Sequence, residues 1–273
     1  MIGENAMYSL SRRIADAIAA YKKKDLHATR AAHTPGRIRA ANEEHKTESG
    51  AYIGEAVYGA LDGIVTTFAV VAGVAGAGLS AGVILILGFA NLIGDGLSMG
   101  VGSYLSTKSK REYQQSERQR EYWEVENFPE GEREEIREIY NRKGFSGDDL
   151  DRAVNVITSD KRIWVETMMN EELGIIEETG HPFFNGLSTF LAFVVAGFLP
   201  LLFFVIGKAV PSVAQYSFQM SVTLTAISLF VVGSLRALVT RASWWRSGLE
   251  MLLVGGAAAL GAFLVGHLLR GLA

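Results

Sequence analysis

A single aspartate stands inside the first long apolar stretch of the chain. The stretch runs from Ile53 to Gly78, and Asp62 lies about ten residues from its start. A stretch of this length can cross a bilayer as a helix. A carboxylate near the middle of such a helix is costly, and it usually faces a bundle interior or a water-filled path for ions or protons. The sequence therefore predicts an ion route at Asp62.

Polar and small residues share one face of each of the first two predicted spans. These faces are formed by Glu55, Gly59, Asp62 and Thr66 on the first, and by Asn91, Asp95, Ser98 and Gly102 on the second, with Met99 beside it. At a rise of about 1.5 Å per residue, Asp62 and Met99 lie at a similar depth, ~14 Å from the cytoplasmic side, with Asp95 a turn deeper. Carboxylate, amide and thioether ligands together favour first-row ions such as Fe²⁺ or Mn²⁺. In the alternative interpretation, Asn91 and Asp95 are hydrogen-bonding residues between helices and Met99 only packs.

A second group of candidate ligands lies in a charged segment outside the spans. Its members fall into pairs at helical spacing: Glu121 and Glu124, Glu132 and Glu135, and Met168 and Glu172, with Met169 next in the chain. Paired glutamates on packed helices are a common form of carboxylate metal site. The alternative is a solvated helical surface, for which Arg118, Arg120, Arg133 and Arg137 offer ion-pair partners.

The apolar windows predict an all-α membrane protein with five transmembrane helices, at residues 53–78, 81–106, 183–206, 210–235 and 247–269. We divide the chain into a 1–50 N-terminal extension, spans one and two in 51–107, a helical insertion in 108–180, and spans three to five in 181–273. The insertion is predicted to hold helices at 108–127, 132–143, 147–157 and 161–173, with Ser146 and Asp160 as N-caps of the last two. Gly59-x-x-x-Gly63 and Gly96-x-x-x-Gly100 permit close helix packing.

Basic residues indicate the orientation. If the N-terminus is cytoplasmic, the connections with basic residues all become cytoplasmic. These residues are Lys46, Lys108, Lys110, Arg111, Arg236, Arg241 and Arg246. The N-terminus and the insertion are then both cytoplasmic. Tyr8, Leu10, Ile14 and Ile18 recur at helical spacing, so residues 1–50 are either an amphipathic helix on the anionic leaflet or a partly ordered tail.

Several classes of protein are disfavoured by composition. The chain has no cysteine, which excludes disulfides and thiolate metal sites, and its five histidines are scattered. No Ser-His-Asp or HExxH pattern indicates an enzyme, and the basic residues give no nucleic-acid surface. No cleavable secretory signal is visible.

The combination resembles the vacuolar iron transporter family. Gly-Ala-Leu-Asp62-Gly-Ile-Val-Thr-Thr-Phe is similar to the first-span signature of that family, and Asp95-Gly-Leu-Ser-Met99-Gly to the second. The insertion, with its paired glutamates and Met168-Met169-x-x-Glu172, is similar to the family's cytoplasmic metal-binding domain. The resemblance runs from about residue 50 to the end. Where plant members are expected to have a glutamate this chain has Asn91, and Asp95 is a candidate replacement.

The resemblance implies a homodimer that exports Fe²⁺, and often Mn²⁺, from the cytosol in exchange for protons, with no prosthetic group. It implies metal ligands at Asp62 and Met99 in the membrane, and at Glu121, Glu124, Glu132, Glu135, Met168, Met169 and Glu172 in the cytoplasm. Glu55, Asn91 and Asp95 would lie on the path. The membrane would be the cell membrane in a prokaryote or an organelle membrane in a eukaryote. The simple five-span topology favours a prokaryotic source, that is, a bacterial-like member of the family. The rival interpretation is a membrane-anchored protein that senses or sequesters metal.

Overall fold

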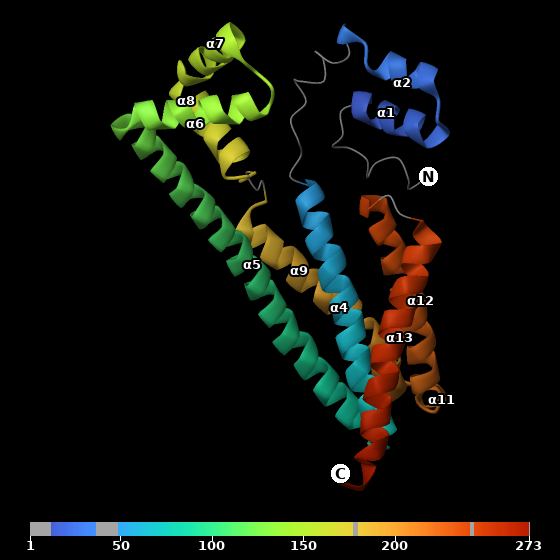
Figure 1. Cartoon of the computed structure of the whole chain (residues 1–273). Coiled ribbons are helices and arrows are strands. Elements are labelled where there is room, and N and C mark those ends of the chain that lie inside the picture. Colours follow the sequence, from blue (N-terminus) through green and yellow to red (C-terminus); the bar gives the residue numbers. More distant parts are fainter. Residues whose placement is uncertain (1–11, 37–48, 177–179, 241–242, 273) are drawn as a thin grey trace. The chain divides into compact units, whose positions relative to one another are not determined.

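The computed structural model describes residues 12–36, 49–176, 180–240 and 243–272, and every regular element within these ranges is a helix (Figure 1). The chain forms two compact units, one of residues 1–96 and 188–273 and one of residues 97–187. These observations confirm the all-α prediction for the part of the chain that is described.

The first unit contains most of the apolar helices. They are α4 (Ser49–Gly76), the first part of α5 (Ala81–Asn127), most of α9 (Pro182–Gly197), α10 (Leu202–Ala209), α11 (Pro211–Ala214), α12 (Ser217–Thr240) and α13 (Trp244–Leu268). Two short 3₁₀ turns, Leu199–Leu201 and Arg270–Leu272, also belong to this unit. Figure 1 shows α4, α12 and α13 side by side, and each of the three packs against the other two.

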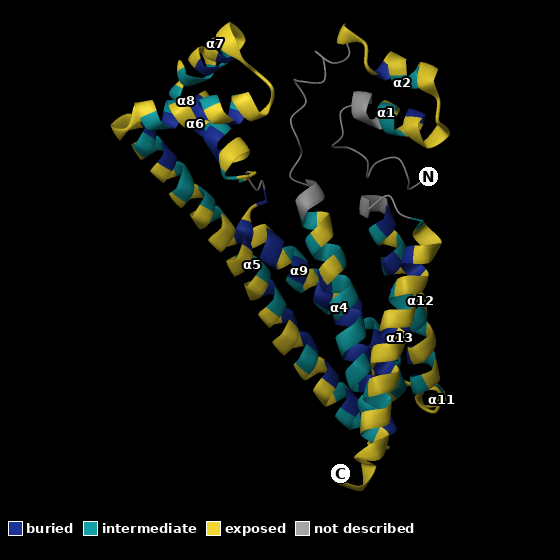
Figure 2. Ribbon diagram, in the orientation of Figure 1, coloured by how far each residue is buried: buried dark blue, intermediate teal, exposed yellow. Residues whose placement is uncertain are grey.

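Five segments are long and apolar enough to cross a membrane, as the sequence predicted. They are Tyr52–Gly76, Ala81–Asn127, Pro182–Ala209, Ser217–Ala237 and Trp244–Leu268. The third is interrupted by a 3₁₀ turn at Pro200, because proline has no amide hydrogen for the helical hydrogen bond. Many large apolar side chains of these helices are exposed (Figure 2), as expected for surfaces that face lipid.

The second span does not end near residue 106. α5 is one continuous helix of 47 residues, whereas we predicted a span over 81–106 and a separate helix over 108–127. The sequence explains the difference, because no glycine or proline lies between Ser103 and Asn127 to end the helix. α5 therefore contributes to both compact units.

Glycines on α4 allow its close approach to α9. A Cβ atom at Gly59 would collide with the carbonyl of Thr189, and one at Gly63 with the carbonyl of Phe193. The first of the two predicted Gly-x-x-x-Gly motifs thus serves packing within the chain.

The second unit is a small helical domain around one apolar core. It contains the end of α5, α6 (Pro129–Arg142), α7 (Gly147–Thr158), α8 (Lys161–Thr167) and the π-helical turn Met168–Glu172. α7 packs against α6 and α8, and the π-helical turn packs against α6 and α8. Buried side chains from all of these form the core: Val125, Ile136, Ile139, Leu150, Val154, Trp164, Val165, Met168 and Met169.

The boundaries of these helices differ from the sequence prediction at two places. α6 begins at Pro129 rather than at 132, because proline fits the first position of a helix, where its missing amide hydrogen has no helical partner. The predicted helix 161–173 is divided between α8 and the π-helical turn. Asp160 caps α8 as predicted, with its carboxylate accepting from the amides of Arg162 and Ile163, while Ser146 holds the N-cap position without a side-chain hydrogen bond.

The N-terminal extension forms two short helices, α1 (Arg12–Lys23) and α2 (Leu26–Ala32), which pack against each other. Ala20 and Ala32 are buried, whereas Tyr21 and Leu26 are exposed. Tyr8 and Leu10 of the predicted amphipathic stretch lie outside the described residues, as do Lys46 and Arg241 of the topology argument.

Candidate metal centre

Three glutamates converge where α5 ends and α6 begins. Glu121 and Glu124 lie one turn apart on α5, and Glu132 follows the short turn at Phe128 in the first turn of α6. One carboxylate oxygen from each of the three lies within 4.8 Å of the other two. We call Glu121, Glu124 and Glu132 the carboxylate trio. Oxygens at this spacing can bind a divalent cation together.

Two members of the trio are buried to a degree that is rare for glutamate. The side chains of Glu121 and Glu132 are 1% and 5% exposed. Within the described residues, atom Oε2 of each is buried and accepts no hydrogen bond. A buried carboxylate oxygen without a partner is costly. A cation that binds both oxygens would remove this cost, so the burial itself indicates a cation site.

Burial and the charges of neighbouring carboxylates raise the pKa of Glu121 and of Glu132. Burial raises the pKa of Glu121 to about 7, against the opposing effect of Arg120. It also raises the pKa of Glu132 to about 7, with repulsion from Glu135 as the next cause. At neutral pH protons and metal ions therefore compete for the same oxygens.

Glu135 and Glu172 belong to the same electrostatic cluster. Burial raises the pKa of Glu172, followed by the charge of Glu135, with which it also shares a hydrogen bond. The charges of both residues act on Glu121 and Glu132. The structure thus brings together all five glutamates that the sequence pairs predicted.

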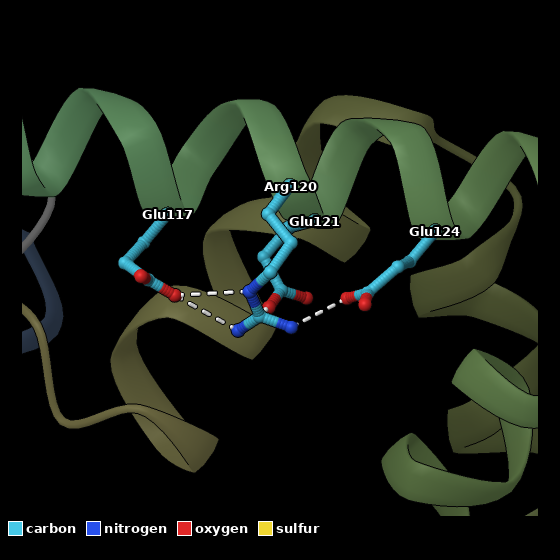
Figure 3. A network of polar contacts seen from close by, with 4 residues as sticks. All are labelled: Glu117, Arg120, Glu121 and Glu124. Atoms are coloured by element: carbon cyan, nitrogen blue, oxygen red, sulfur yellow. Dashed lines mark hydrogen bonds and ion pairs between the residues drawn. The ribbon is translucent and has the colours of Figure 1, made fainter.

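Arg120 lies among these carboxylates (Figure 3). Its Nη2 is 2.8 Å from Oε1 of Glu121 and 2.9 Å from Oε2 of Glu117, and its Nη1 is 2.6 Å from Oε2 of Glu124. Its Nε donates to Oε2 of Glu117 at 3.0 Å. Arg120 was one of four arginines predicted as ion-pair partners, and its spacing alone did not distinguish it from the other three.

Met168 and Met169 are buried in the apolar core of this unit, at 0% and 2% exposure. They begin the π-helical turn that also contains Glu172. Their packing is established by the structure, and their predicted role as thioether ligands stays a prediction.

In the first unit, the predicted polar faces of the first two spans meet. Asn91 Nδ2 donates to Thr66 Oγ1 at 3.3 Å, which joins α5 to α4. Asp62 is half-buried on α4, and Asp95 of α5 lies near enough for the two charges to interact. Asp62 and Asp95, which we predicted on the polar faces of the two spans, thus lie near each other.

Glu55 is bound to a residue that the sequence analysis did not single out. Thr189 of α9 donates to Glu55 Oε2 at 3.0 Å, and its side chain is fully buried. A hydroxyl inside an apolar span was the only sequence signal for it. Met99 lies on α5 in the other compact unit, so its predicted position beside Asp62 stays a prediction.

Comparison with known proteins places the chain in a family. Residues 53–267 match the model of the VIT family. The chain belongs to the VIT family. It is an integral membrane protein of a transporter family rather than an enzyme. The resemblance found in the span signatures and in the insertion is thereby confirmed.

Curated relatives carry consistent names. The vacuolar iron transporter of Toxoplasma gondii is 38% identical over 92% of this chain and 86% of its own length. That of Plasmodium berghei is 32% identical over 95% of this chain and 97% of its own length. Vacuolar iron transporter 1 of Arabidopsis thaliana is 30% identical over 81% of this chain and 87% of its own length. The family match begins at residue 53, in agreement with a resemblance that starts near residue 50, although the first two relatives also align with part of residues 1–50.

Proposed function

We propose that this protein is a proton-coupled transporter that moves Fe²⁺, and also Mn²⁺, out of the cytosol. The proposal rests on one observation: two carboxylates, Asp62 and Asp95, lie within neighbouring helices that are apolar enough to cross a membrane. Charges at this depth are retained in membranes where an ion passes. The names of the relatives support iron as the cargo.

The carboxylate trio would be the collecting site for the cargo. Its buried oxygens need a cation, and the oxygen donors suit hard or borderline divalent ions. Together with Glu135 and Glu172, and with Met168 and Met169 as softer donors, it would raise the local concentration of Fe²⁺ beside the membrane.

Within the membrane, Glu55 at the start of α4 would receive the ion and Asp62 would bind it, with Met99 as a thioether ligand. Metal binding requires the ionised carboxylate, so a proton that arrives at Asp62 from the far side would expel the ion. This competition couples the metal flux to an opposite proton flux. Asn91 and Asp95 would line the same path.

The exposure of α5 supports a homodimer. Asp95 of α5 is exposed on the single chain. A charged group exposed to lipid is unfavourable, so a second copy of the chain would cover this face. The basic residues that flank the spans support a cytoplasmic N-terminus and insertion. The relatives' names support an organelle membrane as the location.

Metal flux into proteoliposomes tests the proposal. Mn²⁺ or Fe²⁺ uptake is measured with and without an imposed pH gradient, for the wild type, Asp62→Asn and the control Asp149→Asn, whose carboxylate is exposed on α7. Gradient-driven uptake is expected in the wild type and the control and should disappear in Asp62→Asn. Full transport by Asp62→Asn would refute the mechanism. Absence of flux in all three proteins, with metal still bound, would instead favour the anchored sensor or sequestering protein.

A further inference from the structure

The guanidinium of Arg120 and a divalent ion would compete for the negative charge of the carboxylate trio. Arg120 contacts Oε1 of Glu121 at 2.8 Å and Oε2 of Glu124 at 2.6 Å, so it takes one oxygen from each of two members. A cation bound through the remaining oxygens of the trio, such as Oε2 of Glu121, would lie beside the guanidinium and repel it. Metal binding therefore favours movement of Arg120 away from the trio.

Arg120 has an alternative partner outside the trio. It also bonds Glu117, one turn earlier on α5, which does not belong to the trio. The side chain of Arg120 is 44% exposed, whereas that of Glu117 is 22% exposed. A rotation toward Glu117 and solvent would free Glu121 and Glu124. Figure 3 shows the guanidinium between Glu117 on one side and Glu124 on the other.

The buried carboxylates of the trio need a positive charge nearby. Glu121 and Glu132 are almost fully buried, and three further carboxylates of the cluster repel them. Arg120 offsets part of this repulsion and holds Glu121 and Glu124 in place.

We propose that Arg120 is a built-in substitute for the metal ion, which holds the carboxylate trio when it is empty and moves to Glu117 when a divalent ion binds. The inference rests on the proposed function in one respect, namely that the trio binds the cargo.

Two consequences follow for selectivity and release. An ion must outcompete a guanidinium that has several charge-assisted contacts, which disfavours monovalent and weakly coordinating cations. When the ion leaves, Arg120 returns to the same oxygens, so the vacated carboxylates are not left unpaired. Arg120 thus lowers the affinity of a site that must hand its ion on, and it sharpens the discrimination between ions.

Equilibrium Mn²⁺ binding to the full-length protein in detergent at pH 8 tests the affinity. Free Mn²⁺ is quantified from its electron paramagnetic resonance signal, for the wild type, Arg120→Gln and the control Arg137→Gln. Arg137 lies on α6 and pairs with Glu134 and Asp151, so its removal changes the net charge equally without touching the trio. Loss of one charge-assisted competitor should tighten Mn²⁺ binding by about tenfold in Arg120→Gln. Equal or weaker binding than in Arg137→Gln would overturn the inference.

Arginine modification of the wild-type protein gives a test that does not depend on the folding of a variant. Phenylglyoxal reacts with accessible guanidinium groups, and mass spectrometry reports the reaction rate of each arginine. Arg120 should react faster in the Mn²⁺-saturated protein than in the metal-free protein, whereas Arg137 should not change. Protection of Arg120 by Mn²⁺, or no effect, would contradict the proposed movement.

The double variant Glu121→Gln/Glu124→Gln separates this inference from the function on which it rests. If it binds Mn²⁺ as the wild type does, the trio is not the metal site and the proposed collecting function fails. If it loses a bound Mn²⁺ while Arg120→Gln binds as the wild type, only the role of Arg120 is refuted.

Discussion

The buried charge of Glu121 should make the metal-free protein less stable as pH rises. Its pKa is about 7 in the folded protein, against 4.5 for a free glutamate. A raised carboxyl pKa means that folding favours the protonated form. The stabilisation is fully present below about pH 4.5 and is lost as pH rises through 7. Glu121→Gln removes the charge and keeps the size of the protonated side chain.

The shift sets the size of the effect. A difference of about 2.5 pKa units corresponds to at most ~3 kcal/mol once the group is fully ionised, as at pH 8. Because Glu121 titrates together with Glu132 and interacts with Arg120, we expect Glu121→Gln to stabilise the metal-free protein at pH 8 by about 1–3 kcal/mol. Near pH 5, where the wild-type group is mostly protonated, the gain should fall below about 1 kcal/mol.

Thermal unfolding of the full-length protein in chelator at pH 5 and pH 8 measures this difference. Trp164 is buried in the core of this unit at 7% exposure, while the other three tryptophans are exposed, so the fluorescence change reports local unfolding. The midpoint of Glu121→Gln should exceed that of the wild type by about 2–10 °C at pH 8. The control Glu138→Gln replaces an exposed glutamate of α6 and should change neither midpoint.

Saturating Mn²⁺ should reverse the order at pH 8, because the wild type gains binding free energy that the variant lacks. A variant that matches the wild type at both pH values, or is destabilised at both in chelator, would refute the argument that Glu121 carries a costly buried charge.

Three further predictions concern the packing and the ligands. Gly63→Ala should lower the free energy of unfolding by about 1–3 kcal/mol, because the added methyl group would collide with the carbonyl of Phe193. In the control Gly94→Ala the added methyl group has no atom within 4 Å, so this variant should not be destabilised in the same unfolding assay. Thr225→Val should raise the unfolding midpoint, because the buried Thr225 hydroxyl has no hydrogen-bond partner among the described residues and its removal recovers about 1 kcal/mol. Thr223→Val, at an exposed hydroxyl bonded to the Gln219 carbonyl, should raise the midpoint less. Met168→Leu should weaken Mn²⁺ binding by about tenfold with little loss of stability, since the apolar volume is kept and the thioether is lost; unchanged binding would exclude Met168 as a ligand.

The sequence by itself determined the class of fold and the faces of the first two spans. Five apolar windows were sufficient because a bilayer demands a fixed length of apolar helix. The spacing of Asp62 and Thr66 on one helix and of Asn91 and Asp95 on the next placed them on common faces, since helical periodicity is a local property. The ends of helices were less predictable. A proline can break a helix or occupy its first position, and the sequence around Pro129 did not show that it begins α6.

Only the tertiary structure decided which of the many glutamates of the insertion form a site. The ten glutamates from Glu112 to Glu138 are similar in type and spacing, and the sequence alone favoured a solvated surface for most of them. The turn at Phe128 folds α6 back so that Glu132 meets Glu121, while the apolar core beneath removes both from water. Burial, and the raised pKa that follows from it, depends on residues far along the chain such as Glu172 on the π-helical turn. Periodicity within one helix carries no information about such contacts, and so the special position of Arg120 among the arginines emerged only from the folded domain.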